Sequence, residues 1–471
     1  MIDTFSIRCS ILRLAFSGKL TQQCMSDGNA RSILSRISPK KSVEQTENTP
    51  YEIPDTWAWV KLADLYTINP KVDAGDAKDA AFIPMERVGA GFNRTFSFER
   101  QSWVQASKNH TKFSDGDVAF AKISPCFENR KSFIAQGLPN GIGGGTTELI
   151  VLRQGEMLPE YTYYLVLDQR FIATGKASYK GTVGQQRVQP DVIKNFFVPV
   201  PPYPEQKRIV ARIEQAFAAL DTIDAFQAKY ADNLAVLKSK LIDAAIRGKL
   251  TDQLPEDGTA EELYRQIQTE KQALVRAGKI KKEKPLPEIT ADEIPFEIPT
   301  NWKWVRLECF GSWHSGATPS RGNSSYYQNG TIPWLKTGDL NDDYISFVPE
   351  SITELALEEC SVRINPIGSV LIAMYGATIG KLGIAQIPLT TNQACCACNP
   401  YNGIYNRFLF FLLMAMRKTF IDMGIGGAQS NISKEKIVNA VVPLPPFAEQ
   451  RRIVAKLEEL LPLCDQSGNF Q

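Results

Sequence analysis

The sequence predicts an α+β fold: two similar, strand-rich domains separated by long antiparallel helices, with pseudo-twofold, circularly arranged halves. Residues 51–204 resemble residues 296–448, a long segment free of Gly and Pro follows Glu205, and a motif near the N-terminus recurs out of order in mid-chain. A repeat of this length has the size of a whole domain and is far too long for a solenoid. Repetition therefore sets the architecture before any single element is assigned.

The central helix is predicted over residues 201–249. Its apolar residues recur about every 3.6 positions, the period of an amphipathic α-helix. They are Ile209, Ile213, Phe217, Leu220, Ile223, Phe226, Tyr230, Leu234, Leu237 and Leu241. Pro201, Pro202 and Pro204 mark its start and Gly248 its end. At 1.5 Å per residue the helix is about 65 Å long, so its apolar stripe needs another long element as cover.

The duplication is clearest around the start of this helix. Val198-Pro-Val-Pro-Pro-Tyr-Pro-Glu-Gln-Lys-Arg-Ile-Val returns as Val442-Pro-Leu-Pro-Pro-Phe-Ala-Glu-Gln-Arg-Arg-Ile-Val. Tyr51-Glu-Ile-Pro-Asp-Thr-Trp-Ala-Trp returns as Phe296-Glu-Ile-Pro-Thr-Asn-Trp-Lys-Trp. Shorter matches pair Thr146-Thr147 with Thr390-Thr391, and Gln185 with Gln429.

The match that is out of order concerns the second long helix. Leu241-Ile-Asp-Ala-Ala-Ile-Arg-Gly-Lys-Leu-Thr resembles Ile11-Leu-Arg-Leu-Ala-Phe-Ser-Gly-Lys-Leu-Thr. We therefore expect this helix to be split, with its start at Glu449–Cys464 and its end at residues 5–20. The two pieces should meet in space and cover the central helix in the antiparallel direction.

Five segments follow from these matches. Residues 1–50 hold the distal helix end and a linker, 51–200 the first domain, and 201–295 the central helix and a linker. Residues 296–446 form the second domain, and 447–471 the start of the split helix.

Apolar runs bounded by Gly, Asn and Pro predict strands in the first domain. They are Ala81-Phe-Ile-Pro, Asp117-Val-Ala-Phe-Ala and Glu148-Leu-Ile-Val-Leu. Helices are predicted at Tyr161–Ile172, 260–277 and Ile404–Lys418, and a loop at 25–50. The basic run that begins at Lys279 is read as a solvated linker.

Composition fits an ordinary globular chain of 471 residues, with 43% apolar residues and a net charge of +2. Nine cysteines, an odd number without paired spacing, predict reduced thiols in a cytoplasmic protein. Cys395-Cys396-Ala397-Cys398 is read as a buried strand rather than a zinc site, because neither histidine is near. Phe408–Met416 is too short to cross a bilayer, and no membrane partner is expected.

Three catalytic patterns fit the sequence poorly. Asp191, Glu205 and Lys207 have the order of a Mg²⁺-dependent nuclease site, but the second copy replaces Asp191 by Glu435 and Lys207 by Arg451. The chain has neither a methyl-donor loop nor the Asn/Asp-Pro-Pro-aromatic motif of a DNA methyltransferase. With only His110 and His314, a Ser/His/Asp set is not plausible. We expect no catalytic, metal or cofactor site.

Two divergent domains on a rigid spacer suit duplex DNA with two unlike half-sites on one face. Amide and guanidinium groups bond bidentately to adenine and guanine, so the Gly-rich loops carry the candidate readers. In the first domain these are Thr182, Gln185, Gln186 and Arg187, with Lys176, Lys180 and Lys194 for phosphates. In the second domain they are Gln429, Ser430 and Asn431.

The second domain resembles the specificity subunits of type I restriction–modification systems. The resemblance rests on Ser315-Gly-Ala-Thr-Pro-Ser-Arg, Ile332-Pro-Trp-Leu-Lys-Thr-Gly-Asp-Leu, Gly368-Ser-Val-Leu-Ile-Ala-Met-Tyr-Gly-Ala-Thr-Ile-Gly-Lys and Gln429-Ser-Asn-Ile. Both Pro-Pro-x-x-Glu-Gln-x-Arg-Ile-Val helix starts and both Gly-Lys-Leu-Thr endings belong to it. The first domain has different sequences in place of these motifs, such as Gly116-Asp-Val-Ala-Phe-Ala-Lys122, as expected of domains that read unlike half-sites.

The resemblance implies a non-catalytic subunit that recognises a bipartite, asymmetric DNA target. It also implies two methyltransferase subunits and a restriction/translocase subunit as partners, which would use S-adenosylmethionine, ATP and Mg²⁺. Recognition residues carried over by motif are Thr318, Lys336, Thr337, Asp339, Tyr375, Thr378, Lys381, Gln429 and Ser430, with Lys122 added in the first domain. Two alternatives stay open: a scaffold that joins proteins without reading DNA, and the Mg²⁺-dependent nuclease.

Overall fold

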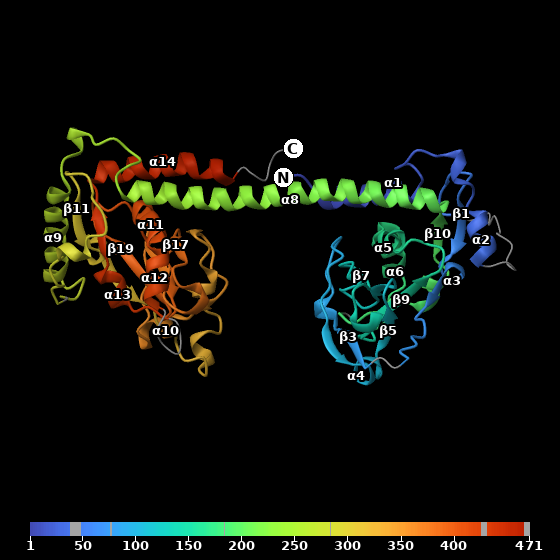
Figure 1. Ribbon diagram of the computed structural model, residues 1–471. Helices are drawn as coiled ribbons and strands as arrows, with labels where there is room; N and C mark the ends of the chain where they lie inside the picture. The colour runs from blue at the N-terminus through green and yellow to red at the C-terminus, as the bar shows by residue number, and fades with distance from the viewer. Residues whose placement is uncertain (38–48, 76–77, 183, 283, 425–430, 466–471) are drawn as a thin grey trace. The chain divides into compact units, whose positions relative to one another are not determined.

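The computed structural model describes residues 1–37, 49–75, 78–182, 184–282, 284–424 and 431–465. The chain divides into two compact units. The first unit is Ile2–Ala228, and the second unit is Lys229–Gln471 together with Met1. Helix α8, Tyr203–Ile246, contributes its first part to the first unit and its last part to the second (Figure 1).

The first unit places short strands between helices at both of its ends. Its helices are α1 Thr4–Phe16, α2 Arg31–Ile37, α3 Leu62–Leu65, α4 Trp103–Ser107, α5 Pro159–Leu167, α6 Gln169–Ala177 and α7 Pro190–Lys194. Its strands are β1 Ala58–Lys61, β2 Tyr66–Ile68, β3 Asp79–Ile83, β4 Glu99–Ser102, β5 Thr111–Ser114, β6 Val118–Ala121, β7 Ser132–Ile134, β8 Ile142–Gly145, β9 Leu149–Gln154 and β10 Phe197–Val200.

The second unit repeats this order. Its helices are α9 Ala260–Arg276, α10 Glu354–Glu359, α11 Asn406–Ala415, α12 Arg417–Gly424, α13 Lys434–Asn439 and α14 Phe447–Asp465. Its strands are β11 Lys303–Arg306, β12 Gly311–Ser315, β13 Ile332–Leu335, β14 Asp343–Ile345, β15 Ser351–Ile352, β16 Val370–Ala373, β17 Leu382–Ala385, β18 Thr390–Thr391, β19 Cys395–Pro400 and β20 Val441–Leu444. The predicted strands at Ala81, Asp117 and Glu148 are confirmed as β3, β6 and β9.

Corresponding strands pair in the same way in both units. The sheets of the first unit have the orders β2-β9-β6-β7, β4-β3-β8-β5 and β1-β10; those of the second have β12-β19-β16-β17-β14, β15-β13-β18 and β11-β20. Val118 pairs with Leu152 in the first unit, and Val370 pairs with Cys398 in the second. The α+β prediction with two similar, strand-rich halves is therefore confirmed.

The terminal helices run antiparallel to α8, each within its own unit (Figure 1). On α1, Thr4 Oγ1 donates to Asp224 (2.6 Å), while beyond its end Gln23 Nε2 donates to Glu205 (2.6 Å). On α14, Lys238 pairs with Asp465, while Glu449 accepts from Gln253 (2.7 Å). The split second helix is thus present as two pieces. Whether the pieces meet end to end remains a prediction.

The apolar stripe of α8 is covered only in part. Ile209, Ile213 and Phe217 are buried, but Phe226 is 67% exposed, and Tyr230 and Leu237 are exposed too. The expectation of continuous cover is therefore wrong for the described residues. The contacts of α1 extend along α8 to Asp224, through Thr4, and those of α14 extend to Lys238, through Asp465, so neither described helix covers the stretch between these two positions.

A buried glutamate fixes each helix start. Glu205 accepts from Trp57 Nε1 (2.8 Å), Gln23 Nε2 (2.6 Å) and Thr21 Oγ1 (3.3 Å). Its counterpart Glu449 accepts from Trp302 Nε1 (2.7 Å), Gln253 Nε2 (2.7 Å) and Thr251 Oγ1 (3.2 Å). We call each set a glutamate clasp. The clasps explain why the Glu-Gln helix starts and the Gly-Lys-Leu-Thr endings recur together, because each motif binds the other.

Three sequence expectations need correction. Residues 25–50 are not all loop: α2 buries Ile33 and Leu34. The helix predicted at 161–172 is two helices, because the Asp168 side chain accepts from Arg170 N (3.0 Å) and starts α6. Thr146-Thr147 and Thr390-Thr391 are not equivalent. Strand pairing places Gly145, not Thr147, where the second unit has Thr391.

The cysteine cluster lies on β19, where Cys395, Cys396 and Cys398 are fully buried among apolar side chains. This confirms the prediction of a buried strand, and burial raises the pKa of the Cys396 thiol to about 12. Among the described residues, no group of His, Cys, Asp and Glu side chains is arranged to hold a metal ion. No helix in the described part of the chain is long and apolar enough to span a membrane.

Candidate functional site

In the first unit, backbone hydrogen bonds gather the candidate readers at one junction. Lys180 and Arg187 bridge each other, with Arg187 N donating to Lys180 O (2.9 Å). The return segment bonds the stretch after β6: Val188 N donates to Lys122 O (2.9 Å), and Ser124 N donates to Gln186 O (2.8 Å). The predicted residues Lys122, Lys180, Gln186 and Arg187 are therefore neighbours. Gln185 and Thr182 share the exposed turn between them.

The Arg187 guanidinium is oriented by a carboxylate that sequence reasoning missed. Its Nη2 and Nε bond Glu148 Oε1 (2.7 Å) and Oε2 (2.9 Å). These bonds, and the charge of Lys122, hold the pKa of Glu148 below its usual value. The Arg187 side chain is still 45% exposed. A guanidinium held in this way loses little side-chain entropy on binding a planar acceptor pair.

The other predicted phosphate contacts lie nearby in sequence but are already paired. Lys194 pairs with Asp191 within α7 (3.3 Å), and Lys176 lies 3.8 Å from Glu128. Exposed surface pairs of this kind exchange readily with solvent and contribute little to stability. They therefore leave these lysines able to turn toward phosphate.

The second unit builds the same junction from different side chains. Ile432 N donates to Met374 O (2.9 Å), as Val188 N does to Lys122 O, and Tyr375 bridges Asn431. Tyr375 is 42% exposed, and Thr378 Oγ1 donates to its carbonyl (2.8 Å). Gln429 and Ser430 lie outside the described residues.

The connection between β18 and β19 joins the remaining candidates to this junction. Ala317 N donates to Thr391 O (3.0 Å), Asn392 N to Leu335 O (2.9 Å), and Met374 N to Ala394 O (2.8 Å). These bonds bring together the stretches that carry Thr318, Lys336 and Tyr375. Lys381 lies beside the end of β16, because Ala373 N donates to the Lys381 carbonyl (2.9 Å).

Side-chain partners divide these candidates by role. Asp339 accepts from the backbone N–H of Lys336 (2.9 Å) and shapes the turn that contains Thr337. Lys336 and Arg321 both pair with Glu350, and the Arg321 guanidinium also stacks 4.8 Å from the Trp334 ring centre. Thr318 donates to Gln393.

Sequence reasoning missed Arg321, Glu350 and Gln393. The signal for Arg321 was present, because it ends the Ser315–Arg321 motif. Glu350 and Gln393 carried no local signal, because only the fold brings them to their partners.

The nuclease alternative does not survive the geometry of its residues. Glu205 is fully buried and committed to its clasp, while Asp191 is exposed and paired with Lys194. The Lys207 ammonium lies 4.9 Å from the Tyr203 ring centre. A Mg²⁺ site needs carboxylate oxygens that face a shared, hydrated position, and these side chains face other partners.

The chain was compared with known families and proteins. The family described as the type I restriction modification DNA specificity domain matches residues 54–228 and 299–466. The specificity subunit of type I restriction enzyme EcoAI from Escherichia coli is 31% identical over 543 aligned positions, covering 99% of this chain and 90% of the relative. The EcoEI specificity subunit, also from Escherichia coli, is 29% identical over 99% of this chain and 91% of its own length.

Solved structures share the fold. A chain from a type I R-M system, studied for complex assembly and conformational transition, superposes with a TM-score of 0.64 at 20% identity. The superposition covers 88% of this chain and 93% of that chain. The HsdS subunit from Thermoanaerobacter tengcongensis gives a TM-score of 0.51 at 20% identity, over 89% of this chain and 92% of that one.

Proposed function

Because this chain belongs to the type I restriction–modification DNA specificity family, we propose that its two units read the two unlike halves of one bipartite, asymmetric DNA target. The chain is the specificity subunit of a multisubunit restriction–modification enzyme and directs methylation and restriction to a target sequence. The family is non-catalytic, so the chemistry belongs to other subunits. What we propose is that each of the two units recognises one half of the DNA target.

One observation carries the proposal: the two units present different side chains on the same backbone junction. Where the first unit has Lys122 and Arg187, the second has Met374 and Asn431. A guanidinium pairs with the O6 and N7 acceptors of guanine, whereas an Asn amide pairs with adenine N6 and N7. Two units that share a backbone arrangement but carry different base-contacting side chains can recognise two different half-sites, as an asymmetric target requires.

We assign direct base reading to the exposed turn with Thr182, Gln185, Gln186 and Arg187 in the first unit. In the second unit we assign it to Tyr375, Thr378 and Asn431, with the adjoining Gln429 and Ser430. Lys122, Lys180, Lys336 and Lys381 hold backbone phosphates, and Thr318, Thr337 and Asp339 shape the second reading surface. Phosphate contacts position a protein on DNA, and base contacts specify the sequence.

For the assembly, we propose two methyltransferase subunits and a restriction/translocase subunit as partners. These partners use S-adenosylmethionine, ATP and Mg²⁺, and this chain holds none of them. A net charge of +2 supports this division, because 51 acidic residues nearly balance the 53 basic ones, so the chain alone attracts DNA weakly. The nine free cysteines suit a reducing cytoplasm.

Exchange of residues 51–200 for the corresponding domain of another family member tests the proposal. The methylated sequence, mapped across a genome by long-read sequencing, should change in one half only. The reciprocal exchange of residues 296–446 should change the other half. A change in both halves, or in neither, after either exchange contradicts the division of labour.

The scaffold alternative is separated by a double substitution, Gln185→Ala with Arg187→Ala. A pure scaffold keeps full methylation of the same sites, whereas a reader loses discrimination in the first half-site. Arg212→Ala is the matched control, because Arg212 is exposed on α8 and bonds only Gln215 (2.7 Å) among its described neighbours.

A further inference from the structure

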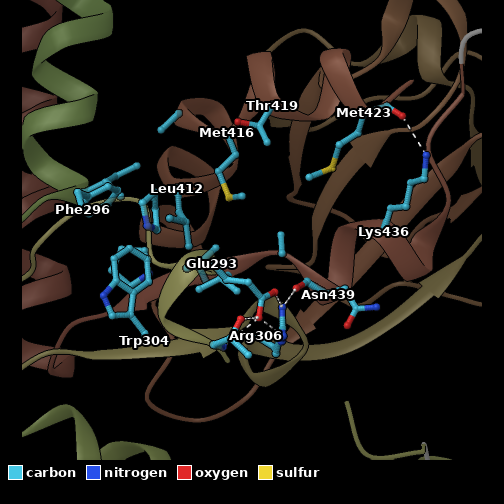
Figure 2. A pocket seen from close by; sticks show the side chains of 18 of the residues that line it. Glu293, Phe296, Trp304, Arg306, Leu412, Met416, Thr419, Met423, Lys436 and Asn439 are labelled. Carbon is cyan, nitrogen blue, oxygen red and sulfur yellow. Dashed lines mark hydrogen bonds and ion pairs between the residues drawn. The ribbon is translucent and has the colours of Figure 1, made fainter. Parts of the chain in front are cut away.

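A pocket of about 1120 Å³ opens in the second unit, between the end of α8, the linker before β11, and helices α11 to α13. Figure 2 shows Phe296 and Trp304 on one side, Met416, Thr419 and Met423 on another, and the Glu293–Arg306 pair below. Pockets that take drug-sized ligands have volumes of about 300 to 1,000 Å³. The space thus exceeds that of a packing defect.

The first unit fills the corresponding place with its own arginine. The Arg170 guanidinium lies 4.0 Å from the ring centre of Phe196, 5.3 Å from that of Trp59 and 5.7 Å from that of Tyr51. Its Nη2 donates to Phe197 O (2.6 Å). Arg170 therefore sits in an aromatic cage with a backbone carbonyl at its edge.

Matching contacts establish which residues of the second unit are equivalent. Tyr51 and Trp59 form an aromatic pair at 4.9 Å, as Phe296 and Trp304 do at 4.9 Å. Leu62 N donates to Phe196 O (2.8 Å), as Leu307 N donates to Ala440 O (2.9 Å). Phe196 therefore corresponds to Ala440.

The equivalent of Arg170 follows from its helix. Arg170-Phe-Ile-Ala-Thr-Gly175 in α6 aligns with Thr419-Phe-Ile-Asp-Met-Gly424 in α12. Phe171 and Phe420 are both fully buried. A Cβ at Gly175 would lie 2.4 Å from Phe127, and one at Gly424 would lie 3.0 Å from Ile379, which occupies the same position after its strand. Arg170 therefore corresponds to Thr419.

The pocket exists because two large side chains of the cage are absent. Thr419 stands for Arg170, and Ala440 stands for Phe196. Phe296, Trp304, Thr419, Ala440 and Val441 all line the opening, so two of the three aromatic walls remain, in Phe296 and Trp304. Thr419 leaves the place of the caged guanidinium open, while Arg247 of α8 covers the Phe296 ring (4.3 Å to its centre) and leaves Trp304 as the open aromatic wall.

The charges around the opening also favour a cation. Acidic side chains in the lining are Asp243, Glu288, Glu293 and Glu435, and basic ones are Arg247, Arg306 and Lys436. Arg247 pairs with Asp243 (2.8 Å) and covers Phe296 from the side of α8, while Arg306 pairs with Glu293 (2.6 Å). Once these two pairs are set aside, the lining holds two carboxylates, Glu288 and Glu435, and one ammonium, Lys436. The net charge of the lining is therefore negative.

We propose that this pocket receives an arginine side chain of a partner polypeptide, in the position that Arg170 fills in the first unit. The aromatic wall attracts a flat cation, and the edge carbonyl of Val441 corresponds to the acceptor that Arg170 uses. The volume leaves room for the backbone segment that carries the arginine. Arginine anchors that enter pockets are a common centre of protein–protein interfaces. The proposal goes beyond DNA reading and does not depend on it.

Binding of short peptides to the full chain tests this assignment. The probes are acetyl-Gly-Arg-Gly-amide, its citrulline analogue, which keeps the shape without the charge, and its lysine analogue. Isothermal titration calorimetry gives the affinities. The arginine peptide should bind about tenfold more tightly than the citrulline peptide, because the cation–π attraction and the charge are lost in the latter.

Substitutions locate the binding. Thr419→Arg rebuilds the filled cage from within and should abolish binding of the arginine peptide. Ala440→Phe restores the ring that corresponds to Phe196 and should tighten binding of the arginine peptide, because Phe196 is the cage ring nearest the Arg170 guanidinium (4.0 Å). Ile421→Arg is the matched control, because Ile421 is 40% exposed on α12 and does not line the pocket.

Each outcome decides the proposal. Equal affinity for the arginine and citrulline peptides, or no binding by the unaltered chain, overturns it. Unchanged binding in folded Thr419→Arg and Ala440→Phe chains overturns it as well, and circular dichroism reports folding. A shift of the chain to a dimer that Thr419→Arg abolishes would identify a second copy, and not a different partner, as the occupant. That result would also overturn it.

Discussion

Removal of the Glu449 carboxylate tests how the motif at the start of α14 holds the second unit together. Both oxygens of Glu449 face donors only: Oε2 accepts from Trp302 Nε1, and Oε1 accepts from Gln253 and Thr251. Glu449 is fully buried, and so is the indole N–H that it binds. Glu449→Ala leaves three donors without this acceptor.

The loss of stability follows from the exposure of each donor. The buried indole N–H of Trp302 cannot reach water, and an unsatisfied buried donor costs about 1 to 3 kcal/mol. Gln253 and Thr251 are less buried and turn to solvent, so each gives up only the net value of its bond, about 1 kcal/mol. Glu449→Ala should therefore lower the free energy of unfolding of the second unit by about 3 to 5 kcal/mol.

Urea unfolding, followed by circular dichroism and tryptophan fluorescence, measures this loss. The twin substitution Glu205→Ala should destabilise the first unit by a similar amount. Trp302→Phe removes the indole N–H that Glu449→Ala leaves without an acceptor. It should therefore lower the free energy of unfolding less in the Glu449→Ala chain than in the unaltered chain. A double-mutant cycle should give a coupling of about 1 kcal/mol or more. Strict additivity of the two substitutions, or a loss below about 1 kcal/mol, would refute the reasoning.

The remaining predictions concern a helix end, a reader and a buried imidazole. Gly248 has φ +69°, and a Cβ there would lie 2.4 Å from Pro299 Cγ, so Gly248→Ala should lower the free energy of unfolding by about 2 kcal/mol or more in the same urea assay. Arg187→Ala should weaken binding of the assembled complex to its target by about 10- to 200-fold, and should relax methylation specificity in the first half-site alone. Burial lowers the pKa of His314 from 6.5 to about 4, with the charge of a nearby arginine assisting. The unfolded chain then takes up this proton first, so stability falls as pH drops from about 6.5 to about 4, and His314→Gln should flatten that part of the pH profile relative to His110→Gln.

The repeat made most of the fold predictable from sequence. Each repeated motif supports the assignment of its counterpart, so the two copies together predict the helix over 201–249 and the split helix. Pro201 and Gly248 also predict the start and end of α8, because proline and glycine have local conformational effects that tertiary contacts do not override. Domain limits at 51, 201, 296 and 447 remain predictions of where one folding segment passes into the next.

Side-chain pairing was harder to foresee. Arg187 was identifiable as a candidate reader, but its partner Glu148 lies at the start of a distant strand and carried no motif. Similarly, Thr146-Thr147 matched Thr390-Thr391 in letters and not in strand register. A two-residue shift between the copies cannot be detected from the sequence where the intervening residues differ. The exposed middle of α8 was missed because periodicity reports which residues share a face and not what lies against that face.

The glutamate clasps have a consequence for how the chain is made. Although the repeated motifs follow a circular order along the sequence, almost every residue of each unit lies in one continuous stretch, Ile2–Ala228 for the first and Lys229–Gln471 for the second. Gln23, Trp57 and Glu205 have therefore all been added to the nascent chain before residue 229, and they leave the ribosome while the second unit is being synthesised. The nascent first unit can close its clasp while the second is still being synthesised, as domains that fold in sequence order do. Because the first unit precedes the second along the chain, synthesis in the N- to C-terminal direction completes one unit before the next begins.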